Sequence, residues 1–325
     1  CNSPAVFQRF INVVFRTLVN EEKVFPYLDD LIIPAKNYEE AVVKLQDVLS
    51  VSAEYGLELN FKKCHFLQRQ IEFLGHLIKQ GCILPSPGKT EAVREFPEPT
   101  NVKQVQSFLG LSGFFRKFIP NYSKISAPLT SLLKKDSTFV FGDQQKEALA
   151  RLKKSLAERP VLSIYNPKLP TELHCDASSD GFGAILLQRS AEDNSLHPVH
   201  YFSRKTNPAQ SRYSSYELEV LSIVEALKKF RVYLLGMQFK IVTDCAAFTK
   251  TLEKKDVCAR VARWTMWLEE FDYSIEHRSG SRMQHVDALS RNAVMAITDG
   301  IISRIQLAQE KDSEVQAIKE ILKEH

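Results

Sequence analysis

The sequence predicts a multidomain fold that combines an α+β part with an α/β part. The chain has 325 residues, which is too many for one small core and indicates two or three domains. Its first 84 residues mix helical and strand-like patterns, and a helical stretch follows from about residue 100 to 160. After residue 170 the patterns run in the order βββαβαβα, which is typical of an α/β domain built around one mixed sheet.

The first part, residues 1–84, is expected to form one mixed domain. Residues 4–20 carry apolar side chains at helical spacing, as do residues 38–56, which end at a glycine. VFPYLDDLIIPA predicts two short strands that meet at Asp29 and Asp30. The segments LELNFKKCHFLQ and IEFLGHLIKQGCIL are both strand-like.

A proline-rich joint separates this part from the rest of the chain. Four prolines lie between residues 85 and 99, and each proline restricts its own backbone and that of the preceding residue. The joint therefore predicts a domain boundary. The helical domain that follows is assigned to residues 85–165.

The C-terminal domain is assigned to residues 166–293. Its strands are TELHCDAS, GFGAILLQ, PVHYFSRK, QFKIVTDC and YSIEHRSG, and its helices cover about 215–235 and 258–271, with another starting at HVDALSRN. These elements predict a mixed five-stranded sheet with flanking helices. Residues 294–325 are expected to form an amphipathic linker helix toward a further, integrase-like domain that this sequence lacks. The sequence starts with Cys1, and its first residues look like the middle of a domain, so a fragment of a longer protein is expected.

The composition says more about the cellular compartment of the protein than about its function. The formal net charge of +4 permits a nucleic-acid partner without arguing for one. The six cysteines have no metal-ligand spacing, which indicates reduced thiols in a cytosolic or nuclear protein. We find no signal peptide and no apolar run that could span a bilayer, so no membrane partner is expected.

Acidic residues mark the ends of two predicted strands and the start of a helix. Asp176 and Asp244 end strands, and Asp287 opens a helix. On the long helix both Glu217 and Glu219 are candidates for a fourth acid. At 100° per residue Glu219 lies on the apolar arc of the helix, whereas Glu217 lies at its polar border. Glu219 is therefore expected to face the sheet.

Four carboxylates at one site repel each other unless cations hold them together. Hard divalent cations prefer oxygen ligands, so such a cluster favours them. Two ions about 3.5–4 Å apart are a standard device for in-line displacement at a phosphodiester. The acids therefore predict a two-metal phosphodiesterase site.

The C-terminal motifs resemble a known family. DASSDGFGAILLQ, ELEVLSIVEALKKFRVYLLG, IVTDC and RWTMWLEEFDYSIEHRSGSRMQHVDALSR resemble the RNase H domain of gypsy-type LTR retrotransposon Pol polyproteins. The family's acidic quartet matches Asp176, Glu219, Asp244 and Asp287, at spacings of 43, 25 and 43 residues. The resemblance implies that these four residues are catalytic and bind two Mg²⁺ ions. It also implies hydrolysis of RNA in RNA·DNA hybrids.

Other residues of this domain keep two interpretations. Asp287 alone would be a helix cap, and His285 is either a proton-shuttling group or a polar loop residue. Trp264 and Trp267 either stack on a base or pack in the core. Contact with phosphate is a hypothesis for two arginines, Arg260 and Arg263.

The resemblance extends to the N-terminal part. SPAVFQRFINVVF, YLDDLII, GLELNFKKCHF and FLGH resemble consecutive motifs of a reverse transcriptase palm, and TNVKQVQSFLGLSGFFRKFIPNYSKISAPLTSLLKK resembles its thumb. In the YxDD motif, which begins at Tyr27, the resemblance makes Asp29 the direct Mg²⁺ ligand and Asp30 its support. A polymerase needs such carboxylates for the ions that bind the nucleotide triphosphate and activate the primer.

Three further residues match nucleotide- or nucleic-acid-binding positions of the family. Gln8 matches the motif that touches the incoming nucleotide or template. Lys63 matches a lysine that lies near the triphosphate. Gly75 lies in the loop that grips the primer. The alternative interpretations are a solvated lysine for Lys63 and a turn residue for Gly75. Phe141 departs from the family, which often has Trp there, and an apolar contact should tolerate the change.

The polymerase site is expected to be incomplete in these 325 residues. The family has another metal-binding aspartate and a fingers domain upstream of SPAVFQ, and no residue here matches them. We therefore expect no primer extension by this chain alone.

The expected function is that of a retrotransposon polyprotein fragment with reverse transcriptase and RNase H parts. Expected partners are RNA·DNA hybrid, primer-template nucleic acid and the rest of the Pol polyprotein, with a dimer as an option. The expected location is a cytoplasmic retroelement particle or the nucleus. The alternative is a decayed or domesticated nucleic-acid-binding module without catalysis.

Overall fold

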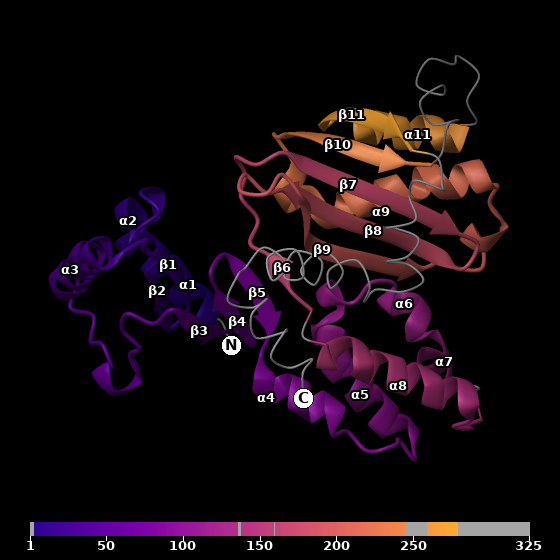
Figure 1. Cartoon of the computed structure of the whole chain (residues 1–325), viewed down its shortest axis with the longest axis horizontal. Coiled ribbons are helices and arrows are strands. Elements are labelled where there is room, and N and C mark those ends of the chain that lie inside the picture. The colour runs from indigo at the N-terminus through magenta and orange to yellow at the C-terminus, as the bar shows by residue number, and fades with distance from the viewer. Residues whose placement is uncertain (1–2, 136–137, 159, 245–258, 279–325) are drawn as a thin grey trace, which may run out of the picture. The chain divides into compact units, whose positions relative to one another are not determined.

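The computed structural model of the chain describes residues 3–135, 138–158, 160–244 and 259–278 (Figure 1). The chain divides into two compact units, Cys1–Arg69 and Gln70–His325. None of the helices within the described ranges has the length and apolar character that crossing a membrane requires. The helices predicted at HVDALSRN and within 294–325 lie outside the described residues.

The first unit packs helices beside a two-stranded hairpin. Its elements are α1 (Ser3–Val14), α2 (Arg16–Asn20), β1 (Phe25–Tyr27), β2 (Asp30–Ile32), α3 (Tyr38–Glu54) and the 3₁₀ turn η1 (Phe61–Lys63). Its core includes Ile11, Phe15 and Val48. The helices predicted at 4–20 and 38–56 and the two strands around the aspartate pair are confirmed.

The strand predicted for LELNFKKCHFLQ, residues 57–68, is wrong. Only η1 is regular there. The Asn60 side chain accepts a hydrogen bond from the Lys62 amide (3.2 Å), so it holds the backbone in a local turn. Short polar side chains often compete with strand pairing in this way. Leu67 also has a positive φ of 53°, which no strand accommodates.

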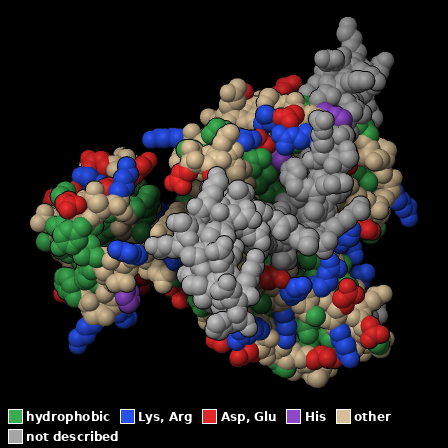
Figure 2. All heavy atoms as spheres, viewed as in Figure 1, with side chains coloured by type: hydrophobic (Ala, Val, Ile, Leu, Met, Phe, Trp, Pro, Cys, Tyr) green, Lys and Arg blue, Asp and Glu red, His purple; other side chains and the backbone are tan. Residues whose placement is uncertain are grey.

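One side of the first unit presents apolar side chains to solvent (Figure 2). The exposed groups on α1 are Val6, Phe7, Phe10 and Val13, and Phe25 of β1 is also exposed. The core of the first unit therefore buries only part of the apolar surface of α1.

The second unit begins with a small antiparallel sheet and a group of helices. The strands β3 (Gln70–Phe73), β4 (His76–Lys79), β5 (Cys82–Pro85) and β6 (Leu162–Ser163) pair in that order. The helices are α4 (Pro87–Arg94), α5 (Val102–Phe114), η2 (Arg116–Phe118), α6 (Tyr122–Ile125), α7 (Ala127–Ser131) and α8 (Asp143–Ala157). The proline-rich joint thus contains α4, because Pro87 lies in its first turn, where no amide donor is needed.

The larger sheet has five strands in the order β11-β10-β7-β8-β9 (Figure 1). Its strands are β7 (Thr171–Ser178), β8 (Gly181–Arg189), β9 (Leu196–Lys205), β10 (Gln238–Thr243) and β11 (Asp272–His277). β7 pairs antiparallel with β8 and parallel with β10, so the sheet is mixed. The helical elements are η3 (Gln210–Arg212), α9 (Ser215–Leu234) and α11 (Ala259–Leu268). The mixed five-stranded sheet with flanking helices is confirmed.

Both faces of this sheet are packed. On one face, Leu173 and Cys175 of β7 share a core with Ile223 and other residues of α9. On the other face, Ile185 and Tyr201 belong to the same core as the residues of the helices α4–α8. The sheet and these helices therefore form one structural unit, and the ends of the strands define where polar side chains can gather.

Candidate active site

Two aspartates lie side by side at one end of the sheet. Asp176 is near the end of β7, and Asp244 directly follows β10. The two strands are parallel and their pairing includes Val242 with His174. Two residues further along each strand, Asp244 and Asp176 fall in the next matching position, on the same face. Asp244 is exposed and Asp176 is partly buried.

Glu219 completes a group of three carboxylates. It projects from the side of α9 that packs against the sheet, and burial raises its pKa to about 8, with further contributions from the charges of Asp244 and Asp176. Its Oε2 atom is buried and has no hydrogen-bond partner among the described residues. Burial, and after it the charges of Glu219 and Asp176, raise the pKa of the Cys175 thiol. These shifts place the three acids within electrostatic reach of one another.

The other candidate on α9, Glu217, has a different task. It forms a capping box with Ser214, because the Glu217 amide donates to Ser214 Oγ and the Ser214 amide donates to Glu217 Oε2. Arg260 also forms an ion pair with Glu217 at 2.8 Å. Glu217 therefore fixes the start of α9 and the docking of α11, while Glu219 faces the acidic group.

The three carboxylates fit a divalent cation by their chemistry. Carboxylate oxygens are the ligands that hard cations prefer, and an orphaned buried oxygen such as Glu219 Oε2 lacks a positive partner. Within the described ranges, no three His, Cys, Asp or Glu side chains approach closely enough to chelate an ion. Asp287 and His285 lie outside the described residues.

The aromatic and basic residues of α11 lie on its packed and exposed sides, respectively. Trp264 and Trp267 are partly buried against the core shared with α9. Arg260 stacks over the ring of Tyr213 at 4.1 Å. Arg263 is exposed and lines an open pocket of about 380 Å³ together with Trp264, on the side of α9 away from Glu219.

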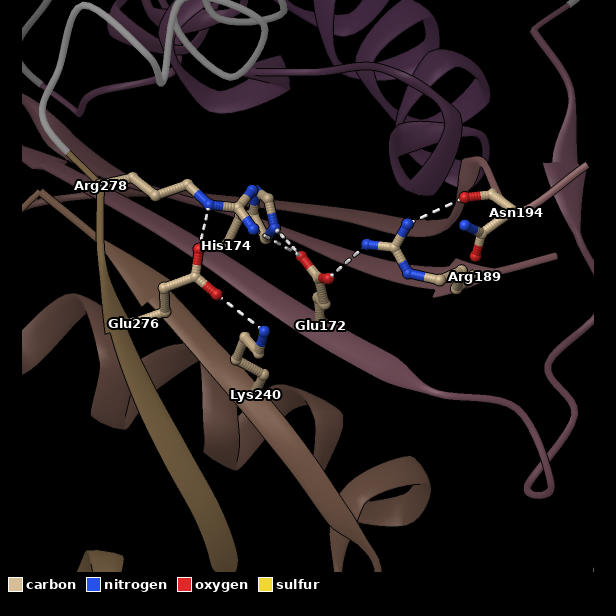
Figure 3. Close-up of polar contacts among 7 residues, drawn as sticks. All are labelled: Glu172, His174, Arg189, Asn194, Lys240, Glu276 and Arg278. Carbon is tan, nitrogen blue, oxygen red and sulfur yellow. Dashed lines mark hydrogen bonds and ion pairs between the residues drawn. The ribbon is translucent and has the colours of Figure 1, made fainter.

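The sequence interpretation missed an ion-pair network around Glu172 (Figure 3). Glu172, His174 and Asp176 alternate along β7 and therefore share one face of the strand. The Glu172 carboxylate contacts His174 Nε2 at 2.8 Å and accepts from Arg189 Nη2 at 3.0 Å, with Arg278 at 3.7 Å. Glu172 and His174 are both buried. The signal was present in TELHCDAS, where polar residues recur at every second position of an otherwise apolar strand.

This network is expected to stabilise the fold strongly. The hydrogen bond from His174, followed by that from Arg189, lowers the pKa of Glu172 to about 2. Glu172→Gln removes a buried carboxylate that His174, Arg189 and Arg278 contact, and should lower the free energy of unfolding by about 3–5 kcal/mol at pH 7. Denaturant unfolding measures this loss, with Glu91→Gln as the control, since the exposed Arg94–Glu91 pair is expected to contribute no more than about 1 kcal/mol.

The same pKa shift sets the pH dependence of this contribution. A carboxylate with a lowered pKa in the folded state stabilises the protein above its ordinary pKa of 4.5. The contribution is lost as the pH falls from 4.5 toward 2. The difference between the wild type and Glu172→Gln should therefore shrink in acid. Equal stability of the two proteins at pH 7 would contradict this account.

In the first unit, Asp29 and Asp30 lie at the tip of the β1–β2 hairpin and both are exposed. The turn contains Leu28 in a left-handed conformation, with φ of 50°. Gln8 of α1 braces it, because Gln8 Oε1 accepts from the Leu28 amide (2.6 Å) and Gln8 Nε2 donates to the Pro26 carbonyl (3.3 Å). Gln8 thus positions the aspartate pair, a contact that the sequence did not reveal.

The remaining predicted residues are exposed or lie in turns. Tyr27 ends β1 and Lys63 ends η1, and both are exposed. Gly75 belongs to the second unit and has φ of 73° in the β3–β4 turn, which favours glycine. A Cβ there would lie 2.5 Å from Lys89 Nζ and 3.2 Å from the ring of Phe114. Gly75 therefore allows both the turn and the close approach of this lysine.

Family models match two segments of the chain. Residues 1–78 match the model described as reverse transcriptase (RNA-dependent DNA polymerase). Residues 166–271 match the RNase H-like domain found in reverse transcriptase.

Curated relatives cover most of the chain. The chain is 38% identical over 294 residues to the retrovirus-related Pol polyprotein from transposon 297 of Drosophila melanogaster, covering 89% of the chain and 27% of that protein. It is 36% identical over 293 residues to the transposon Tf2-3 polyprotein of Schizosaccharomyces pombe, covering 89% and 22%, respectively. The chain thus spans about a quarter of the length of these relatives.

Solved structures share the fold. The foamy viral protease-reverse transcriptase in complex with an RNA/DNA hybrid superposes with a TM-score of 0.73 at 22% identity, covering 86% of this chain and 38% of that chain. A complex of the foamy viral enzyme with double-stranded DNA gives 0.75 at 21% identity, covering 85% and 49%. With a segment that matches reverse transcriptase followed by one that matches an RNase H-like domain, the chain is similar to the Pol polyproteins of transposons over most of its length.

Proposed function

We propose that residues 166–293 act as the RNase H domain of a gypsy-type LTR retrotransposon polyprotein and hydrolyse the RNA strand of RNA·DNA hybrids. The convergence of Asp176, Glu219 and Asp244 carries this proposal, since the charges of the two aspartates, after burial, raise the pKa of Glu219. Foamy viral protease-reverse transcriptase, which has a similar fold, has been solved with an RNA/DNA hybrid, and this supports the substrate class.

The residues of the site have separate roles in this proposal. Asp176 and Asp244 offer carboxylates from adjacent parallel strands, and Glu219 offers a third from α9. Asp287 would supply the fourth. Two Mg²⁺ ions, when bound, supply the Lewis acidity that activates water and stabilises the leaving oxygen of a phosphodiester. Burial and the charges of Asp244 and Asp176 raise the pKa of Glu219 to about 8, so its carboxyl group would have to ionise to hold a cation.

The rest of the second unit would support binding of the hybrid. Arg263 is exposed on α11, where it would contact phosphate. Gly75 and the loop around it would hold the primer strand, since the glycine allows Lys89 to approach the backbone closely. Recognition would be mostly by backbone and shape, with contacts to 2′-hydroxyl groups distinguishing RNA from DNA.

Residues 1–84 would contribute the end of a polymerase palm, and residues 85–165 its thumb. Asp29 would bind Mg²⁺ and Asp30 would support it, on the hairpin that Gln8 braces. Tyr27 and Lys63 would face the nucleotide or the nucleic acid. In this proposal the polymerase works on primer-template nucleic acid as part of a longer Pol polyprotein, in a cytoplasmic retroelement particle.

Strand selectivity tests the proposal. Three duplexes of one sequence, RNA·DNA, DNA·DNA and RNA·RNA, are incubated with the chain and Mg²⁺, and each labelled strand is followed on a denaturing gel. We expect cleavage of the RNA strand of the hybrid alone. Comparable cleavage of the DNA duplex would contradict the assignment. Binding of the hybrid without any cleavage would support a non-catalytic nucleic-acid-binding module instead.

A further inference from the structure

A row of residues crosses three strands beside the acidic group. Asp176 of β7 pairs with Gly183 of β8, and Gly183 pairs with Ser203 of β9. Residues directly opposite in antiparallel strands present their side chains on the same face. The row therefore has a carboxylate at Asp176, a gap at Gly183 and a hydroxyl at Ser203.

A loop of the helical segment is fixed across this row. The Ser123 amide donates to Ser203 Oγ at 2.9 Å, and Arg116 Nη2 donates to the Ser203 carbonyl at 2.7 Å. Tyr122 is buried in the core, where its hydroxyl lies 3.0 Å from Ser112 Oγ. These contacts hold residues 116–123 against the strands at the level of Asp176.

Asn121 of this loop fills the gap at Gly183. Its Oδ1 lies 3.2 Å from the position that a Cβ of Gly183 would have. Side chains directly opposite each other have Cβ atoms about 4.5–5.5 Å apart, so the Asn121 amide lies where a lateral neighbour of Asp176 would be. An alanine at position 183 would crowd Asn121, because 3.2 Å is tighter than an ordinary contact.

We propose that Asn121 is a positioning residue for Asp176, with its side-chain amide holding the carboxylate from the side so that the carboxylate is oriented for a divalent cation. This inference rests on the proposed function of the site. It extends that site to the helical segment, outside residues 166–271 that match the RNase H-like family model. Hydrogen-bonded partners of ligating carboxylates commonly contribute 10–100-fold to metal affinity or activity.

The backbone conformation at position 121 offers a competing explanation for the presence of an asparagine there. Its φ is 50°, in the left-handed region that asparagine tolerates. Asn121→Gly separates the two roles, because glycine adopts this conformation freely and removes only the side-chain amide. Asn194 is a matched control: it is exposed in the β8–β9 turn and has φ of 56°. Asn194→Gly makes the same change remote from Asp176.

The test uses the full chain and measures Mg²⁺ binding by calorimetry, cleavage of an RNA·DNA hybrid, and thermal unfolding. For Asn121→Gly we expect Mg²⁺ affinity or the cleavage rate to fall about 10–100-fold with an unchanged unfolding temperature. Asn194→Gly should match the wild type in all three. Wild-type affinity and rate in Asn121→Gly would overturn the inference. If the wild type itself cleaves no hybrid, it is the proposed function that fails.

A second variant, Gly183→Ala, keeps the inference testable if Asn121→Gly unfolds, and it completes a double-mutant cycle if Asn121→Gly folds. Gly183→Ala leaves Asn121 in the chain and pushes its amide away from its place. We expect Gly183→Ala to weaken Mg²⁺ binding in the wild type and to have little further effect in Asn121→Gly, because both changes act through one contact. Wild-type Mg²⁺ affinity in Gly183→Ala, or additive losses in the double variant, would overturn it.

Discussion

Replacing Asp176 by asparagine should reduce cleavage of an RNA·DNA hybrid by at least about a hundredfold. Asparagine keeps the size of the side chain and loses its charge. Metal ions stabilise a phosphodiester transition state by several kcal/mol, and each 1.36 kcal/mol is a factor of ten in rate. Because Asp176 lies between Asp244, which follows β10, and the row that leads to β9, we expect no other described carboxylate to take its place.

The matched control for this variant is Asp180→Asn. Asp180 lies in the exposed β7–β8 turn, four residues further along the chain, and belongs to no part of the acidic group. Initial rates are measured on a labelled hybrid, and circular dichroism verifies folding. A rate for Asp176→Asn close to that of the wild type would remove this residue from the active site. So would an equal loss in Asp180→Asn.

Glu219→Gln should make the metal-free protein more stable while abolishing cleavage. Burial and the charges of Asp244 and Asp176 raise the Glu219 pKa from 4.5 to about 8, so the folded state resists its ionisation. The raised pKa lowers the free energy of unfolding. This loss is absent below pH 4.5, grows as the pH rises, and is complete above pH 8. At pH 7 the neutral glutamine should raise the free energy of unfolding by about 3 kcal/mol.

The opposite pattern is expected for Glu217→Gln. This change weakens the capping box and the Arg260 ion pair, so stability should fall by roughly 1 kcal/mol while cleavage is retained. Denaturant unfolding in EDTA at pH 5 and pH 8 measures both variants. The increase in the free energy of unfolding caused by Glu219→Gln should be larger at pH 8 than at pH 5. A loss of stability at pH 8 would show that Glu219 is not held against like charges.

Much of the fold and part of the site followed from the sequence. The strands from β7 to β11 could be predicted because their apolar runs are bounded by turn residues, and α9 because its apolar side recurs at helical spacing. The choice of Glu219 over Glu217 also came from helix periodicity. That choice needs only local geometry, since the arc that packs on the sheet is fixed once the helix is known.

The features that were missed depend on contacts between distant segments. His174 on the same strand is the main cause of the low pKa of Glu172, but its arginine partners come from β8 and from the residue after β11, so the full network depends on tertiary pairing. Asn121 lies next to Gly183 only because the helical segment shares a core with the sheet. The strand predicted at 57–68 failed for a local reason, namely the Asn60 side chain that holds a turn.

The central claim is that the converging carboxylates form a divalent-metal nuclease site. The most direct measurement is cleavage of a labelled RNA·DNA hybrid by the full chain, as Mg²⁺ is added to protein first treated with EDTA, with Asp176→Asn in parallel. The account predicts no cleavage in EDTA, cleavage of the RNA strand that rises with Mg²⁺, and none by the variant. Cleavage that is independent of Mg²⁺, or equal in the variant, would contradict it.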